Sequence, residues 1–166
     1  MKTSIIVGLA ALALGAAASF ALQQRETSAP EVRFATLSGE SFATSDLRGK
    51  VVLVNFWATS CVICVEEMPK MIETYKKFAP RGYEMVAVAM SYDHPNQVAQ
   101  FAKSRGLPFK VALDTNGAIA KSFGDIRVTP TTFLLDRKGR VLKQYLGEPD
   151  WPAFHGLLDK ALRDPA

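Results

Sequence analysis

The stretch VVLVNFWATSCVICVEEMP, residues 51–69, decides how this chain folds. Its first seven residues, 51–57, form an apolar run with several β-branched side chains, which is typical of a strand buried on both faces. From Cys61 to about Ala79 apolar residues recur at helical spacing, so a helix follows the strand directly. A helix that starts where a buried strand ends begins at the carboxyl edge of the sheet, where open α/β folds carry their functional sites.

Strand and helix patterns alternate along the rest of the chain. Strands are expected at 32–37, 83–90, 109–113, 131–136 and 140–146, and helices at 95–105, 117–123 and 151–163. A tight turn at 137–139 joins the last two strands as a hairpin. This order predicts an α/β fold in which helices flank both faces of a mixed central β-sheet.

Length, composition and charge limit the classes of protein to consider. The chain has 166 residues, and 48% of them are hydrophobic, which suits one compact domain with a substantial core. Its net charge is +4 and the basic residues are scattered, so nucleic acid is not expected as a partner. We expect the protein to be a monomer.

The N-terminal segment is separate from the predicted domain. Residues 5–22 are almost wholly apolar and carry no charge, which is typical of an export segment. Residues 1–21 are either a cleaved signal peptide or an N-terminal membrane anchor, and both alternatives stay open. A polar linker, 22–30, leads to the domain at 31–166. In either case the domain is expected in the periplasm or at the outer face of the cytoplasmic membrane.

The only two cysteines, Cys61 and Cys64, are separated by two residues. An even number of cysteines in an exported chain raises the alternative of a structural disulfide. However, a bridge that closes a loop of about four residues removes little chain entropy and stabilises the fold weakly. The spacing better suits a disulfide that opens and closes, so we interpret the pair as chemically active.

The start of the helix is a favourable place for thiol chemistry. The thiolate is the nucleophile, and a helix N-terminus stabilises it through unpaired backbone N–H groups and the helix dipole. Ser60 is the residue expected to cap this helix. We expect Cys61 to be the more exposed cysteine and to attack a partner disulfide. Cys64, one turn deeper, would then resolve the mixed disulfide.

Two acidic residues follow the cysteines, and helix geometry separates them. At about 100° per residue, Glu67 lies roughly 60° from Cys64 around the helix axis, whereas Glu66 lies on nearly the opposite side. Glu67 is therefore the candidate to accept the Cys64 proton. The alternative, a solvated acid favoured by the helix dipole, stays open. Pro69 is expected to kink the helix, and Trp57 to pack in the core beneath the site.

With its strand, C-x-x-C pair, acid and proline, the stretch 51–69 resembles the TlpA/ResA-like branch of the thioredoxin-like proteins. The resemblance extends over about residues 31–166, including a leading β-hairpin and an inserted strand–helix element. It implies a thioredoxin-like fold and an exported or membrane-tethered thiol–disulfide oxidoreductase. In this family Cys61 would attack, Cys64 would be the buried cysteine and Glu67 the active-site acid. The redox-active disulfide itself would be the redox centre, with no further cofactor and no metal.

The resemblance also implies roles for residues around the cysteines. Asn55 stands where cytoplasmic thioredoxins carry a buried aspartate, which leaves the proton-acceptor role to the glutamate. Pro130, in the loop 128–133, would be the family's cis-proline, with the Thr129 backbone pairing with an extended substrate segment. Ser60 replaces the tryptophan that the family usually has beside the attacking cysteine. It therefore belongs to the expected substrate contact.

The residues between the cysteines bear on the direction of electron flow. The dipeptide Val62-Ile63 contains neither proline nor histidine, and nothing resembles the histidine-containing loop of strong oxidants. The resemblance therefore favours a reductant of disulfides in exported proteins, with clients in cytochrome c maturation or copper-site assembly. A membrane thiol-reductant is expected to supply the electrons.

Two alternative functions share this fold. A peroxiredoxin-like peroxidase requires a threonine three residues before its reactive cysteine, and position 58 is alanine. A copper-binding chaperone module would use both cysteines, with His94 or His155 completing the site. Copper-delivery relatives usually space their cysteines three apart rather than two, and we interpret both histidines as surface residues.

Overall fold

A computed structural model describes residues 28–164. Its elements are β1 (Arg33–Ala35), β2 (Ser41–Ala43), η1 (Thr44–Leu47), β3 (Val51–Trp57), α2 (Val62–Phe78), η2 (Ala79–Arg81), β4 (Tyr83–Ala89), α3 (Pro95–Arg105), β5 (Lys110–Leu113), α4 (Ala118–Ser122), β6 (Thr131–Leu135), β7 (Val141–Leu146) and α5 (Trp151–Arg163). The expected export segment and linker residues 22–27 lie outside the described residues. Within the described range, no helix combines the length and apolar content needed to cross a membrane.

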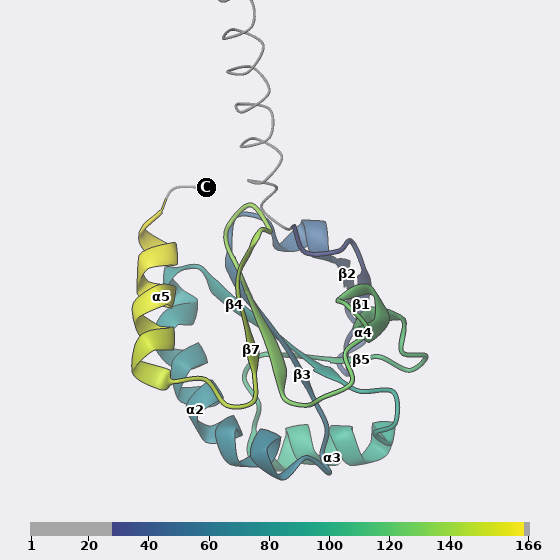
Figure 1. Cartoon of the computed structure of the whole chain (residues 1–166). Coiled ribbons are helices and arrows are strands. Elements are labelled where there is room, and N and C mark those ends of the chain that lie inside the picture. Colours follow the sequence, from purple (N-terminus) through teal and green to yellow (C-terminus); the bar gives the residue numbers. More distant parts are fainter. Residues whose placement is uncertain (1–27, 165–166) are drawn as a thin grey trace, which may run out of the picture.

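Five strands form the central sheet, in the order β5-β4-β3-β6-β7 (Figure 1). β3 pairs parallel with β4 and antiparallel with β6, β4 pairs parallel with β5, and β6 pairs antiparallel with β7. β1 and β2 form a separate antiparallel hairpin. The predicted mixed sheet is therefore confirmed, with β3 at its centre.

All seven residues of β3 are buried because both faces of the sheet are covered. Leu53 and Trp57 face a cluster that includes side chains of α2, α3 and α5. Val54 and Phe56 face a second cluster, built with the β1–β2 hairpin and α4. Since alternate residues of a strand point to the same face, Asn55 shares the face of Leu53 and directs its amide towards α2.

The chain enters the domain at the end of the sheet opposite the start of α2 (Figure 1). The Ala29 N–H donates to the Gly139 carbonyl in the β6–β7 turn at 2.9 Å. Just before β3, the Gly49 N–H donates to the Arg137 carbonyl in the same turn at 2.8 Å. β3 then runs about 20 Å, at about 3.3 Å per residue, before the turn that carries Cys61.

Candidate active site

Cys61 occupies the N-cap position of α2. The turn from β3 is closed by a hydrogen bond from the Cys61 N–H to the Ala58 carbonyl at 3.1 Å, and the helix begins at Val62. Cys61 has an extended backbone, with φ −86° and ψ 106°, and its Sγ accepts the Cys64 N–H at 3.3 Å. The expectation that Ser60 caps the helix is therefore wrong, because Ser60 lies inside the turn and is exposed.

Cys61 and Cys64 form a disulfide, and their Cα atoms lie 5.3 Å apart. Cys64 is fully buried, whereas Cys61 is partly exposed, which confirms the expected order of accessibility. Between them, Val62 and Ile63 are 69% and 48% exposed. A partner molecule therefore reaches Cys61 first, next to an apolar surface that the intervening dipeptide provides.

Glu67 is buried one turn further along α2, with 1% of its surface exposed. Its Oε1 accepts the Asn55 Nδ2 at 3.3 Å, and its Oε2 has no hydrogen-bond partner among the described residues. Burial raises the pKa of the Glu67 carboxyl from 4.5 to about 8; the Asn55 hydrogen bond lowers it, the charge of Glu148 raises it and Lys70 lowers it. The alternative of a solvated acid is therefore wrong. Glu67 is a buried acid that changes charge close to neutral pH.

Asn55 links Glu67 to strand β6. Its Nδ2 also donates to Thr132 Oγ1 at 2.9 Å, and the whole side chain is buried. Asn55 Oδ1, like Glu67 Oε2, has no hydrogen-bond partner in the described part of the chain. A protonated Glu67 has a hydrogen to donate, whereas an ionised one can only accept. These unpaired oxygens therefore favour the neutral acid in the folded protein.

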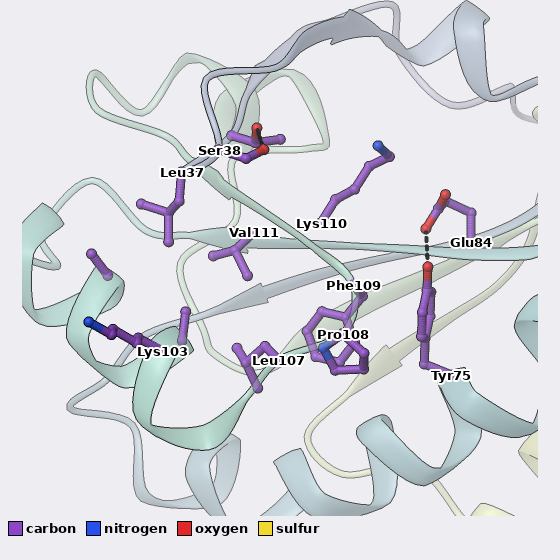
Figure 2. A pocket seen from close by; sticks show the side chains of 13 residues that line it. Leu37, Ser38, Tyr75, Glu84, Lys103, Leu107, Pro108, Phe109, Lys110 and Val111 are labelled. Atoms are coloured by element: carbon purple, nitrogen blue, oxygen red, sulfur yellow. Dashed lines mark hydrogen bonds between the residues drawn. The ribbon is translucent and has the colours of Figure 1, made fainter.

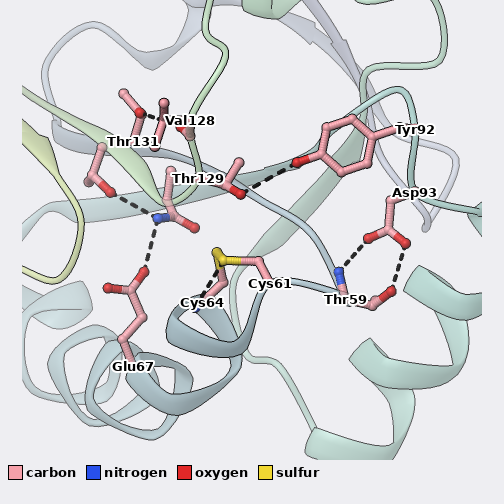
Figure 3. The surroundings of a disulfide bond; sticks show 11 residues. Thr59, Cys61, Cys64, Glu67, Tyr92, Asp93, Val128, Thr129 and Thr131 are labelled. Carbon is pink, nitrogen blue, oxygen red and sulfur yellow. Dashed lines mark hydrogen bonds between the residues drawn. A yellow bond between two sulfur atoms is a disulfide. The ribbon is translucent and has the colours of Figure 1, made fainter.

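The loop before β6 faces the disulfide from the side (Figure 3). Its Thr129–Pro130 peptide bond is cis, as the resemblance implied. Two hydrogen bonds hold the loop: the Thr131 hydroxyl donates to the Val128 carbonyl at 2.6 Å, and the Gly147 N–H donates to the Pro130 carbonyl at 2.8 Å. Val128 is exposed and adds a further apolar side chain close to the site, besides Val62 and Ile63.

The connection between β4 and α3 contributes two residues that sequence patterns did not single out. The two carboxylate oxygens of Asp93 accept the Thr59 N–H at 2.5 Å and the Thr59 hydroxyl at 2.6 Å. The neighbouring Tyr92 is exposed, and its hydroxyl lies 3.4 Å from Thr129 Oγ1. The sequence marks this connection only as a helix start before Pro95. Because the contact with Thr59 spans 34 residues, no local pattern reveals it.

Two residues were expected to support the site geometrically. Trp57 is fully buried in the same cluster as Cys64, and its ring centre lies 5.2 Å from that of Phe101, so the predicted core packing is confirmed. Pro69 lies inside α2, which continues to Phe78. The kink at Pro69 stays a prediction.

Each histidine makes a hydrogen bond of the fold. His94 is the N-cap of α3 and accepts the Asn96 N–H at 3.3 Å. His155, on α5, shares a hydrogen bond of 2.9 Å with the Thr74 hydroxyl. Across residues 28–164, no group of three or more His, Cys, Asp and Glu side chains is arranged to hold a metal ion.

A cavity of about 560 Å³ lies beside β5 and the end of α3 (Figure 2). Leu107, Phe109 and Val111 contribute apolar walls, and Lys103 and Lys110 contribute cationic groups. None of the predicted site residues lines it. The thiol site lies elsewhere, around the start of α2, where Cys61 is partly exposed.

Comparisons with known proteins agree with this geometry. The family model described as Redoxin matches residues 24–160. The thiol-disulfide oxidoreductase ResA of Bacillus thuringiensis (strain Al Hakam) is 36% identical over 132 residues, which are 80% of this chain and 75% of the relative. A solution structure from Neisseria meningitidis, assigned provisionally as a thioredoxin, is 40% identical with a TM-score of 0.77; the match covers 83% of this chain and 92% of that one.

A second solved structure extends the likeness. It is a thiol:disulfide interchange protein of the thioredoxin family from Chlorobium tepidum TLS, 29% identical, with a TM-score of 0.75. The match covers 83% of this chain and 97% of that one. With paired cysteines at a helix start and relatives of this similarity, the chain belongs to the Redoxin family and, within the thioredoxin superfamily, to the TlpA/ResA-like thiol-disulfide oxidoreductases.

Proposed function

We propose that this thiol-disulfide oxidoreductase reduces disulfides of exported proteins. The observation that carries the proposal is the arrangement of a partly exposed Cys61 at a helix start, a buried Cys64 and a buried Glu67. The direction of electron flow rests on the dipeptide Val62-Ile63, which offers no histidine to stabilise the reduced thiolate.

The first half of the reaction takes place at Cys61. In the reduced protein, N–H groups of the first turn of α2 stabilise its thiolate, and the Cys64 N–H already binds this sulfur in the disulfide form. The thiolate attacks one sulfur of a client disulfide. A bond forms between Cys61 and the client, the client disulfide breaks, and the released client sulfur takes up a proton.

The second half depends on Cys64 and Glu67. The Cys64 thiol gives its proton to the ionised Glu67 carboxylate and attacks the Cys61 sulfur. The Cys61–Cys64 disulfide forms and the mixed disulfide breaks. The second client sulfur leaves as a thiolate and takes up a proton from water, so two electrons pass to the client. Since the pKa of Glu67 is about 8, the proton-accepting form becomes more populated as the pH rises through neutrality.

The client contacts in this proposal surround Cys61. The Thr129 backbone, next to the cis bond at Pro130, pairs with an extended client segment as an added strand. Exposed Val62 and Val128 offer apolar contacts, and the small Ser60 leaves space beside the sulfur.

The location and partners of the protein are part of the same proposal. The apolar segment 5–22 supports export, as a cleaved signal or as a membrane tether. Clients are then proteins on the outer side of the membrane whose cysteines must be kept reduced, as in cytochrome c maturation or copper-site assembly. A membrane thiol-reductant returns the Cys61–Cys64 disulfide to the dithiol.

A redox titration of the purified protein tests the direction of electron flow. The fraction of the Cys61–Cys64 disulfide is measured after equilibration with glutathione or dithiothreitol buffers. A potential near that of thioredoxin, about −270 mV, supports the reductant; a potential near that of the strong oxidant DsbA, about −120 mV, overturns it.

Trapping of intermediates tests the division of labour between the cysteines. Cys64→Ser is expected to accumulate mixed disulfides through Cys61, because the resolving thiol is missing. The matched control, Cys61→Ser, retains a thiol that is buried and is expected to trap little. Equal trapping by both variants would contradict the assigned roles.

A further inference from the structure

The connection between β4 and α3, residues 91–94, contacts both loops of the thiol site (Figure 3). Asp93 binds Thr59, which follows β3 in the turn before Cys61. Tyr92 lies within 3.4 Å of Thr129, in the loop before β6. The connection thus joins the loop that carries the reactive sulfur to the loop that carries the cis-proline.

The contact between Asp93 and Thr59 restricts Thr59 in two directions. One carboxylate oxygen accepts the backbone N–H at 2.5 Å and the other accepts the hydroxyl at 2.6 Å. Asp93 is only 8% exposed, and hydrogen bonds to a charged group are strong where water is excluded. Two bonds from one side chain therefore fix the position and the orientation of Thr59.

The orientation of Thr59 bears directly on Cys61. Thr59 lies two residues before Cys61, inside the turn that the Cys61 N–H closes on Ala58. Cys61 is the N-cap residue, and its sulfur receives the Cys64 N–H only while this turn keeps its shape. Both hydrogen bonds between Asp93 and Thr59 are made by nitrogen and oxygen atoms. The same donors and acceptors are therefore present in the reduced and in the oxidised protein.

We propose that Asp93 is a positioning residue for disulfide exchange. By binding Thr59 at two atoms, it holds the Cys61 sulfur against the N-terminal N–H groups of α2 and so sets the reactivity of the thiol. Asp93 acts through Thr59 and not on the reacting atoms. The inference rests on the proposed function only in that Cys61 is the attacking cysteine.

Four variants separate positioning from charge. Asp93→Asn removes the charge and keeps both contacts, since its amide oxygen accepts the Thr59 N–H and its amide nitrogen donates to the hydroxyl. Asp93→Ala removes both contacts. Thr59→Val removes the hydroxyl contact alone, and Thr59→Ser is its matched control.

The measurement is the alkylation rate of Cys61 by iodoacetamide in the reduced full chain, between about pH 5 and pH 10, with the reduction potential measured alongside. Asp93→Ala and Thr59→Val are expected to lower the rate at pH 7 about fivefold, the equivalent of one lost capping hydrogen bond, and to move the inflection to higher pH. Asp93→Asn and Thr59→Ser are expected to stay within about twofold of wild type.

Several outcomes overturn the positioning role. One is an unchanged pH profile of alkylation in Asp93→Ala or in Thr59→Val. Another is an equal loss of alkylation rate in Asp93→Asn and Asp93→Ala, which would assign the effect to the charge of Asp93. If Asp93→Ala does not fold, Thr59→Val against Thr59→Ser decides the question. Failure of the proposed function is distinguishable, because a wild-type protein that reduces no client disulfide still gives alkylation profiles.

Discussion

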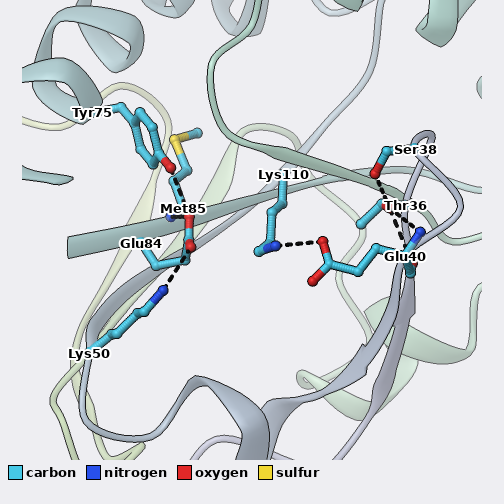
Figure 4. Close-up of polar contacts among 8 residues, drawn as sticks. All are labelled: Thr36, Ser38, Glu40, Lys50, Tyr75, Glu84, Met85 and Lys110. Atoms are coloured by element: carbon cyan, nitrogen blue, oxygen red, sulfur yellow. Dashed lines mark hydrogen bonds and ion pairs between the residues drawn. The ribbon is translucent and has the colours of Figure 1, made fainter. Parts of the chain in front are cut away.

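Two glutamates of the domain, Glu67 and Glu84, are buried in different surroundings. Glu84, on β4, is 6% exposed and uses both carboxylate oxygens (Figure 4). Its Oε1 accepts the Tyr75 hydroxyl at 3.2 Å and the Met85 N–H at 3.1 Å, and its Oε2 forms an ion pair with Lys50 at 3.2 Å. Every oxygen of this acid is occupied by a contact of the fold.

Glu67 is buried more deeply and has fewer contacts. It has one donor, the Asn55 amide at 3.3 Å, and its second oxygen is unpaired within the described residues. Burial without matching donors favours the protonated acid, and a protonated acid with a pKa close to neutrality can exchange its proton. The comparison teaches that these two buried glutamates differ more in the hydrogen-bond donors around them than in their burial.

The largest expected difference is in the pH dependence of stability. The pKa of Glu67 is about 8 in the folded protein and about 4.5 in the unfolded chain, so its contribution is complete below about pH 4.5 and is lost as the pH rises towards 8. The loss is roughly 3 to 5 kcal/mol. Glu67→Gln is expected to lack this part of the pH dependence, measured by urea unfolding of the oxidised protein. Equal dependence in both proteins would contradict the raised pKa.

The next largest effect is on resolution of the mixed disulfide. Glu67→Gln is expected to slow this step about a hundredfold, because Cys64 loses its proton acceptor. Rapid-quench measurements with a disulfide peptide give the rate. The exposed neighbour supplies the control, since Glu66→Gln is expected to leave the rate unchanged. Identical rates in wild type and Glu67→Gln from pH 5 to 8 would remove Glu67 from the mechanism.

Glu84→Gln is expected to have the opposite profile. It loses the ion pair with Lys50 and the charge that Tyr75 binds, at a cost of about 2 kcal/mol in the free energy of unfolding. The rate of disulfide exchange is expected to stay at the wild-type value. The two assays are urea unfolding at pH 7 and peptide reduction. A slower exchange at unchanged stability would mean that the roles of the two glutamates are not separate.

The smallest effect concerns a single hydrogen bond of Glu84. Burial and the charge of Glu84 raise the pKa of Tyr75 to about 12, so its hydroxyl remains a donor over the accessible pH range. Tyr75→Phe keeps the ring contact with Phe109, at 5.7 Å between centres, and loses the hydroxyl. The expected cost is about 1 kcal/mol, measured by thermal or urea unfolding. A cost as large as that of Glu84→Gln would show that the Tyr75 hydroxyl accounts for the whole contribution of the Glu84 contacts to stability.

The sequence predicted the regular elements best where one physical rule dominated. β3 and α5 have the predicted bounds, because a buried apolar run and a continuous apolar helix face leave little choice. α3 begins at Pro95 as expected, since proline suits a first turn. The start of α2 was wrong by one residue. Ser60 is the better cap by residue type, but the turn closed on Ala58 gives the position to Cys61.

Contacts between distant segments limit how much of the site could be predicted from the sequence. Helix geometry placed Glu67 on the side of Cys64, yet only the packed fold shows that the acid is buried and poorly paired. Asp93 binds Thr59, which lies 34 residues earlier in the chain. Glu84 lies in a mostly apolar strand, whose pattern gives no sign of a buried acid. Such contacts depend on tertiary structure, so periodicity and spacing carry no signal for them.

The β6–β7 turn contacts both ends of the described chain. Its Gly139 carbonyl accepts the Ala29 N–H, and its Arg137 guanidinium donates to the Leu162 carbonyl. Positions near residues 29 and 162, at the two ends of the described range, therefore lie about a strand length from the cysteine pair. A fusion partner or a solid support joined there would not compete with clients for the same surface. Immobilised protein would keep the surface around Cys61 accessible to the solution. It would therefore suit affinity capture of mixed disulfides with clients.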